Sequence, residues 1–104
     1  MAYLQLNGCN LHYTDQGEGE PVLLIHGLGS SERDWEYQLP ALLPGYRVLC
    51  LDMRGHGKSE KPKGGYSVKT FAEDCLAFIA FMQLSKPHIV GISMGGMIAF
   101  QLAT

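Results

Sequence analysis

The sequence has no excess of charge of either sign and no long apolar run. Its 104 residues carry 8 basic and 10 acidic side chains, which gives a formal net charge of −2 at pH 7. This near balance provides no electrostatic basis for binding nucleic acid or an anionic membrane surface. Because a membrane-spanning helix needs roughly 18 or more consecutive apolar residues, no membrane segment is predicted.

Paired cysteine motifs and an N-terminal targeting signal are also lacking. The three cysteines, Cys9, Cys50 and Cys75, match neither a C-x-x-C motif nor the spacing of a zinc site. Their odd number favours buried free thiols in a reducing compartment, and no metal site is predicted. The first residues show no charged stretch followed by an apolar core. We therefore expect no signal peptide and a cytoplasmic protein.

Neither common glycine-rich phosphate-binding motif is present. The G-x-G-x-x-G pattern does not occur, and segment 55–59 (GHGKS) only resembles the end of a P-loop. Asp52 stands where the first glycine of a P-loop would fall, and its charge repels phosphate. Pro62 blocks the helix that should follow the motif. No nucleotide or other cofactor is predicted.

What the sequence does have is the composition of a packed protein, and residues 1–104 are expected to belong to a single domain, of which they form the N-terminal part. Hydrophobic residues make up 46% of the chain and charged residues 17%. Alternating segments 3–6 and 11–14 flank a turn cluster and predict an antiparallel hairpin. The uninterrupted apolar run at 22–25 predicts a strand covered on both faces, as in a parallel sheet, and the largely apolar segments 47–51 and 87–90 predict two more buried strands.

Helical patterns lie between and after these strands. Ser30 and Ser31 offer capping hydroxyls for a short helical stretch from about Arg33 that is interrupted or restarted at Pro40. Ser67 can cap a longer helix, in which apolar residues recur at three- and four-residue steps. The segment 97–103 predicts a last helix, and Met94 is expected to open it. This order predicts an α/β fold, with an N-terminal antiparallel hairpin leading into a mostly parallel sheet flanked by helices.

The segment 91–96, GISMGG, joins the last predicted strand to the last predicted helix. A serine between two glycines at such a turn is the arrangement of a nucleophile elbow. The flanking glycines are needed because the chain reverses so tightly that a β-carbon would clash. The serine hydroxyl is then exposed above the sheet. Ser93 is therefore the candidate nucleophile.

The segment 26–29, HGLG, leaves the first parallel strand and is expected at the same end of the sheet as Ser93. An acyl-transfer enzyme needs N–H donors there, because charge develops on the carbonyl oxygen as the nucleophile attacks. The backbone N–H groups of Leu28 and Met94 are the candidate oxyanion hole. An ordinary glycine turn explains segment 26–29 equally well.

Together these segments resemble the α/β-hydrolase family over essentially the whole chain. Segment 17–27 is similar to the family's third strand and oxyanion loop, 52–59 to its D-x-R-G-H-G-x-S pattern, and 91–96 to its elbow in the serine form. The resemblance implies hydrolysis of an ester, thioester, lactone or related bond of a small molecule through an acyl-serine intermediate. The elbow is similar to that of enol-lactonases, small carboxylesterases and cofactor-free perhydrolases. The dehalogenase and epoxide-hydrolase branches use aspartate there.

The resemblance also implies that the catalytic histidine and acidic residue follow well after the elbow, and the chain offers no convincing general base. His26 is nearest to Ser93, but a hydrogen bond that holds the loop is favoured over catalysis. His88 lies five residues back on the same strand, roughly 16 Å away. His56 is expected two strand spacings, about 10 Å, from the strand of Ser93. We expect the N-terminal part of a larger hydrolase, and leave open whether it is active alone.

The strand that ends near Ile92 is central in the family's order, but here it would form a sheet edge with unpaired backbone groups. The predicted partners are therefore the missing C-terminal part or a second copy of the chain. The alternative function is that of a catalytically incomplete fragment, which assembles or binds only through this edge.

Three further residues have two interpretations each. Trp35 either walls a substrate pocket or packs the short helix onto the sheet. Asp52 and Arg54 either take part in catalysis or fix the loop in which they lie, and the second role is favoured.

Overall fold

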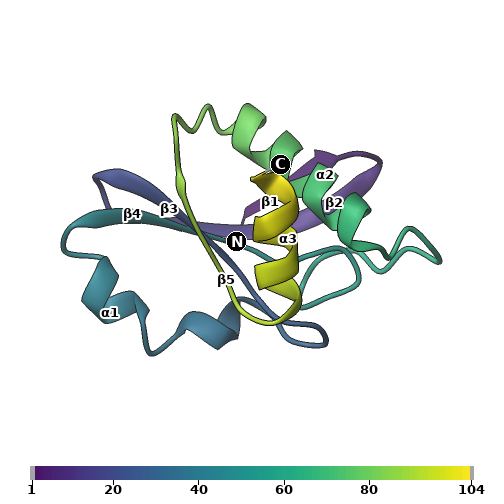
Figure 1. The fold of residues 1–104 in the computed structure, drawn as a ribbon, viewed down its shortest axis with the longest axis horizontal. Helices are drawn as coiled ribbons and strands as arrows, with labels where there is room; N and C mark the ends of the chain where they lie inside the picture. The colour runs from purple at the N-terminus through teal and green to yellow at the C-terminus, as the bar shows by residue number, and fades with distance from the viewer. Residues whose placement is uncertain (1, 104) are drawn as a thin grey trace.

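The computed structural model describes residues 2–103 of the chain. Figure 1 shows a twisted sheet with helices packed against it. In chain order the elements are β1 (Ala2–Leu6), β2 (Cys9–Gln16), β3 (Glu20–Ile25), η1 (Glu32–Trp35), α1 (Leu39–Leu42), β4 (Tyr46–Leu51), α2 (Val68–Phe81), β5 (His88–Gly91) and α3 (Met94–Leu102). Across the described residues, none of the helices is long and apolar enough to cross a membrane.

The five strands form one mixed sheet in the order β1-β2-β4-β3-β5. The β1–β2 and β2–β4 pairs are antiparallel, whereas β3 runs parallel to both of its neighbours, β4 and β5. Ile25 at the end of β3 is in register with Leu51 of β4 and Gly91 of β5. The carboxyl ends of the three parallel strands therefore lie level at one end of the sheet, where ligand sites form in α/β folds.

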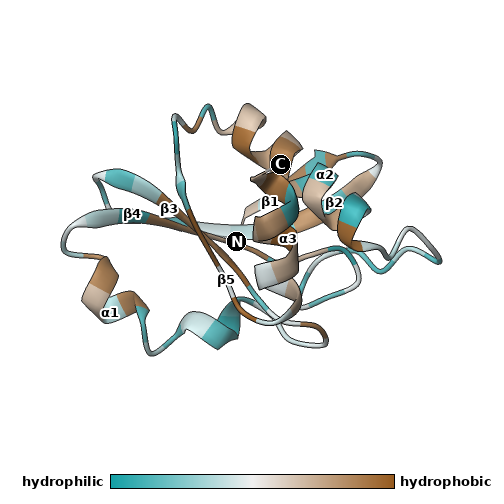
Figure 2. Cartoon of the chain, in the orientation of Figure 1, coloured by the Kyte–Doolittle hydropathy of each residue, from teal (hydrophilic) through white to brown (hydrophobic). Residues whose placement is uncertain are grey.

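The central strands β3 and β4 are covered on both faces, as their apolar runs predict, whereas β5, also predicted to be covered, is an edge strand with exposed residues at alternate positions. Leu23 and Ile25 point into a core cluster with residues of α2 and α3. Val22 and Leu24 point to the other face, where Trp35 of η1 covers them. Figure 2 shows the apolar colouring that runs along the central strands where they cross. This two-sided burial holds the end of β3 in a fixed position.

One strand differs from the expectation at its end. β2 continues to Gln16 in a segment predicted as loop, because residues 13–16 pair with β4. The last helix begins at Met94, the residue expected to open it, because the turn before it passes directly into helical hydrogen bonds.

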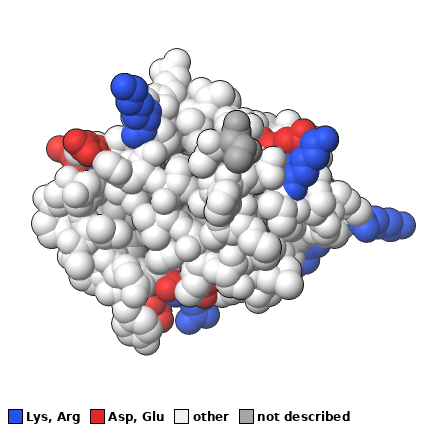
Figure 3. Space-filling view, in the orientation of Figure 1, with Lys and Arg blue, Asp and Glu red and all other residues white. Residues whose placement is uncertain are grey.

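β5 lies at one edge of the sheet and, within the described residues, pairs only with β3. Val90 and Ile92 are 43% and 51% exposed, and Met97 and Phe100 on α3 are 57% and 77% exposed. Figure 3 shows charged side chains near the outline of this face and none over its middle. The edge strand and the outer side of α3 thus form one apolar, uncharged surface.

Candidate active site

Ser93 follows Ile92 in the two-residue connection between the end of β5 and the start of α3, and its backbone conformation is strained. Its φ is 55° and its ψ is −116°, a backbone conformation that residues other than glycine rarely adopt. The residue is exposed, and its side chain makes no capping hydrogen bond to α3. The hydroxyl is therefore presented to solvent at the carboxyl end of the parallel strands.

Contacts around the turn explain why glycine flanks this serine at two positions. A β-carbon on Gly91 would lie 2.1 Å from the carbonyl oxygen of Gly95. One on Gly95 would lie 2.1 Å from the carbonyl oxygen of Ile25, whereas Gly96 has nothing nearer than 3.7 Å. Since both of the first two contacts are with backbone atoms, neither can be relieved by a side chain moving away. The pattern G-x-S-x-G is a steric requirement of this turn, and Gly96 is not part of that requirement.

The turn is also tied to the neighbouring strand. The N–H of Ile92 donates to the carbonyl oxygen of Ile25 at 3.2 Å, which extends the β3–β5 ladder past the end of β5. The carbonyl oxygen of Ser93 accepts from the N–H groups of Gly96 and Met97, which begins α3. The position of Ser93 is thus set by a strand on one side and a helix on the other.

The loop that leaves β3 lies against the elbow. A β-carbon on Gly27 would be 3.6 Å from the β-carbon of Ser93. A tight turn follows, in which the N–H of Ser30 donates to the carbonyl oxygen of Gly27 at 3.2 Å and Gly29 adopts a φ of 77°. Over residues 2–103, the N–H groups of Leu28 and Met94 donate to no protein acceptor. Both candidate oxyanion donors are free, and their catalytic role stays a prediction.

His26 is fully buried beneath this loop, and both of its ring nitrogens have partners. Nε2 lies 3.0 Å from the N–H of Met53 and accepts from it, so the proton is on Nδ1, which donates to the carbonyl oxygen of Gly27 at 2.7 Å. Burial lowers the pKa of His26 below its ordinary value. A neutral imidazole whose two nitrogens are both hydrogen-bonded has no free nitrogen for Ser93. This is the loop-holding role that the sequence favours.

Asp52 holds three segments together at the end of β4. Its carboxylate accepts from the N–H of Glu32 at 2.8 Å, from the N–H of Lys58 at 3.1 Å and from Nδ1 of His12 at 3.0 Å. Gly57, with a φ of 53°, lets the backbone approach that carboxylate, because a β-carbon there would be 2.4 Å from Oδ2. Asp52 thus fixes a loop, as expected, and its oxygens are already taken by donors.

Comparison with known proteins gives the family to which this arrangement belongs. The family model described as "alpha/beta hydrolase fold" matches residues 20–104. The chain belongs to the α/β-hydrolase family. It is 36% identical to a soluble epoxide hydrolase of a Corynebacterium species over 98 residues, which are 94% of this chain and 34% of that protein. It spans about a third or less of the length of the first curated relatives that it matches.

Solved α/β hydrolases superpose on nearly all of this chain. A bromoperoxidase from Bacillus anthracis has a TM-score of 0.93 and 42% identity, covering 97% of this chain and 38% of its own. The enol-lactonase from Burkholderia xenovorans has a TM-score of 0.88 and 36% identity, covering 98% of this chain and 41% of its own. The similarity is therefore to one contiguous part of larger α/β hydrolases.

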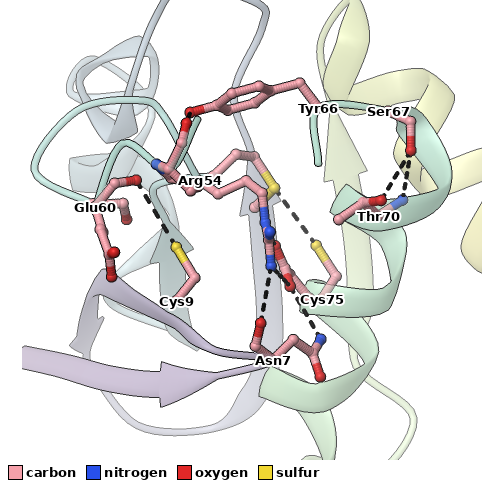
Figure 4. Close-up of polar contacts among 12 residues, drawn as sticks. Asn7, Cys9, Arg54, Glu60, Tyr66, Ser67, Thr70 and Cys75 are labelled. Atoms are coloured by element: carbon pink, nitrogen blue, oxygen red, sulfur yellow. Dashed lines mark hydrogen bonds and ion pairs between the residues drawn. The ribbon is translucent and has the colours of Figure 1, made fainter. Parts of the chain in front are cut away.

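Arg54 completes the D-x-R-G-H-G-x-S segment of this α/β hydrolase and lies away from the elbow. Its guanidinium donates two hydrogen bonds to the carboxylate of Asp74 in α2, at 2.7 and 2.9 Å. It donates a third, at 3.4 Å, to the carbonyl oxygen of Asn7, and Figure 4 shows this bond. The ion pair with Asp74 raises the pKa of Arg54. Arg54 therefore ties the hairpin turn to α2, which is a structural role.

One group of side chains in the described residues has the composition of a metal site. His12, Glu32 and Asp52 offer ligand atoms within 4.8 Å of one another. Oε2 of Glu32 is buried and has no hydrogen-bond partner in this part of the chain. A cation there would have to displace the bond between His12 and Asp52, so the arrangement is that of a hydrogen-bonded anchor. The expectation that the hydrolase needs no metal stays a prediction.

Trp35 is 8% exposed and packs against Val22 and Leu24 on the face of the sheet beneath η1. This is the packing role that the sequence left open, and a role in a substrate pocket stays a prediction.

The other histidines of this hydrolase are also engaged. His56 is buried, and its Nδ1 lies 3.0 Å from the carbonyl oxygen of Arg54. His88 is bonded to Glu20 at 2.7 Å at the opposite end of the parallel strands. His12 is bonded to Asp52. Among residues 2–103, no histidine bonds to Ser93.

Asp34 is the residue of this site that sequence reasoning missed. Its carboxylate accepts from the N–H of Gly27 at 3.0 Å and from the hydroxyl of Ser30. Both bonds lower the pKa of Asp34, and the bond from Ser30 has the larger effect. A single aspartate in a polar stretch carries no sequence signal of its own. The proximity of Ser30, four residues earlier, was the only available hint.

Proposed function

We propose that this chain carries the nucleophile and the oxyanion donors of a serine hydrolase that acts on a carboxylic ester, a lactone or a related acyl bond. The observation that carries the proposal is the strained, exposed Ser93, held beside two free N–H groups. A backbone strain of this kind costs on the order of 1–3 kcal/mol and persists where the surroundings impose it, commonly at active sites.

The proposed reaction has two stages. In the first, Oγ of Ser93 loses its proton to a general base and bonds to the acyl carbon. The carbonyl electron pair moves to the oxygen, which the N–H groups of Leu28 and Met94 bind, and the tetrahedral intermediate expels the alcohol with that proton. In the second stage, water attacks the acyl-serine in the same way. The acid is released and the Ser93 hydroxyl is restored.

We further propose that the general base is a histidine outside these 104 residues, supported by an acidic residue. Two observations favour this arrangement. The histidines of the described chain are bonded elsewhere. The curated relatives are also about three times as long as the chain or longer. Without a base, a serine hydroxyl is a weak nucleophile, so little turnover is expected from the chain in isolation.

An acyl substrate is favoured over an epoxide by the residue at position 93. The relatives include a soluble epoxide hydrolase, but the resemblance implies that its branch attacks with aspartate, whereas this chain has serine. Likeness to an enol-lactonase and to an esterase from Exiguobacterium antarcticum supports ester or lactone chemistry.

The nucleophile is tested with a fluorophosphonate probe on the full-length protein. We expect covalent labelling at Ser93, located by mass spectrometry of the labelled peptide, and none in Ser93→Ala. Hydrolysis of p-nitrophenyl acetate should fall in Ser93→Ala by a factor on the order of 10⁴ to 10⁶. If Ser93 stays unlabelled while a control hydrolase in the same tube is labelled, the proposal is wrong.

The alternative is a module that assembles through the β5 edge. It is favoured by the unpaired side of β5 and the exposed apolar side chains of Val90, Ile92 and Phe100 beside it. An exposed strand edge is a template for pairing with another chain. This alternative predicts self-association in light scattering and no esterase turnover. A monomer that hydrolyses p-nitrophenyl acetate would exclude it.

A further inference from the structure

The Leu28 N–H can bind an oxyanion only if the peptide that carries it is held in one orientation. That N–H belongs to the same planar peptide unit as the carbonyl of Gly27. In a trans peptide the two groups point in opposite directions, and no peptide bond among the described residues is cis. Whatever holds the Gly27 carbonyl oxygen therefore aims the Leu28 N–H.

Two donors hold that oxygen. Nδ1 of His26 donates to it at 2.7 Å, and the N–H of Ser30 donates to it at 3.2 Å. The peptide before Gly27 is held separately, because its N–H donates to Oδ2 of Asp34 at 3.0 Å. The peptides on both sides of Gly27 are thus fixed, although glycine itself is the least restricted residue.

Asp34 is the side chain that joins the two sides of this turn. Its other oxygen, Oδ1, accepts from the hydroxyl of Ser30, the residue whose N–H holds the Gly27 carbonyl. One carboxylate therefore links the first and last residues of the four-residue turn 27–30. Asp34 also donates its own N–H to the carbonyl oxygen of Ser31 at 3.1 Å, so it is anchored at the start of η1.

From this geometry we propose that Asp34 is a positioning residue that sets the direction of the Leu28 N–H toward the oxyanion. The inference rests on the proposed function. Asp34 touches no reacting atom, and its effect passes through Gly27 and Ser30. Because Gly27 lies against Ser93, a shift of the turn changes the distance from the donor to the nucleophile. Misplacement by about 1 Å can cost on the order of 10²-fold in rate.

The test compares Asp34→Ala, Asp34→Asn and Ser30→Ala in the full-length protein, with p-nitrophenyl acetate as substrate. Asp34→Ala removes both bonds, and kcat should fall by about 10²-fold with KM nearly unchanged, because the donor acts mainly in the transition state. Asp34→Asn keeps a carbonyl oxygen for the Gly27 N–H and should restore most of kcat. Ser30→Ala removes one bond, so the loss should be smaller and in the same direction.

Inhibition by phenylboronic acid gives a readout that a general loss of stability would not produce. The boronate forms a tetrahedral adduct with the serine hydroxyl and places an oxygen where the oxyanion would lie. Its inhibition constant should rise in Asp34→Ala by about the factor by which kcat falls. Asp15→Ala, which breaks a half-exposed ion pair with Arg47, is the matched control and should change neither quantity.

The outcomes separate this inference from the proposed function. If Ser93→Ala keeps its turnover, the proposed function fails and the inference fails with it. If Ser93→Ala loses turnover while Asp34→Ala keeps wild-type kcat and inhibition, only the inference is overturned. A rise in KM alone also overturns it. Should Asp34→Ala not fold, unchanged kcat and inhibition in Ser30→Ala overturn it.

Discussion

The α-carbon of Gly95 lies so close to the carbonyl oxygen of Ile25 that a β-carbon at position 95 would be 2.1 Å from that oxygen. Ile25 ends the first parallel strand, and Gly95 is in the first turn of α3. This contact lets the helix start directly against the strand end. It therefore sets how near the nucleophile lies to the loop that follows β3.

Gly95→Ala should destabilise the protein by about 1–3 kcal/mol or more, because the contact is with backbone that cannot move aside. It should also reduce fluorophosphonate labelling of Ser93. Gly96→Ala is the matched control, since its β-carbon would meet nothing nearer than 3.7 Å. That change should be neutral or should stabilise by up to about 1 kcal/mol, as alanine is the better helix former. Equal unfolding midpoints in urea for the two variants would contradict the steric argument.

Ser93→Gly should be more stable than Ser93→Ala by about 1 kcal/mol, although both variants lack the nucleophile. The φ of 55° at position 93 is strained for alanine and free for glycine. The greater unfolded-state entropy of glycine offsets part of this relief. Chemical unfolding of the two variants measures the difference. A Ser93→Ala protein as stable as Ser93→Gly would show that the turn is not strained.

The sequence predicted those parts of the fold that local chemistry determines. The hairpin formed around Asn7 and Gly8, which both take positive φ values, and Ser67 caps α2 by accepting from the N–H of Thr70. The steric role of Gly91 in the elbow was also predictable, because it depends on the turn itself.

What the sequence did not predict depends on contacts between distant segments. β2 extends to Gln16 only because β4 lies beside it. Two adjacent glycines, poor helix formers, lie in the first turn of α3, and no local pattern shows that contact with Ile25 requires one of them there. The place of Asp34 beneath the turn depends on how η1 docks on the sheet, and no local pattern carries that information.

Asp74→Ala should be among the more damaging substitutions outside the elbow. The Arg54–Asp74 pair is 9% and 0% exposed, and Asn7 also donates to Asp74 at 3.0 Å. Removing one partner leaves a buried charge unpaired, which costs about 3–5 kcal/mol. Asp15→Ala breaks the Asp15–Arg47 pair, which is 29% and 33% exposed, and should cost about 0–1 kcal/mol. Urea unfolding of both variants checks the ranking, and similar losses would be inconsistent with it.

His26 should make stability depend on pH in the mildly acidic range. Burial lowers its pKa from 6.5, and the hydrogen bond to Gly27 offsets part of this effect. His56, whose ring centre is 5.1 Å away, lowers the pKa further, and Asp52 and Asp34 raise it. The folded state therefore binds fewer protons at His26 than the unfolded state does. By linkage, its contribution to stability is complete above about pH 6.5 and is lost as the pH falls below that value.

The slope of unfolding free energy against pH isolates this contribution. Between pH 6.5 and 5 the stability should fall as the pH falls, with a slope that for this one proton is at most about 1.4 kcal/mol per pH unit. His26→Asn loses bonds to Met53 and Gly27 and should be less stable at pH 8, but its slope should be shallower than that of the wild type. The other histidines are present in both proteins, so their contributions cancel to first order in the difference. Because the neutral ring accepts from the Met53 N–H, protonation must break that bond, so equal slopes would mean that His26 is not held neutral in the folded protein.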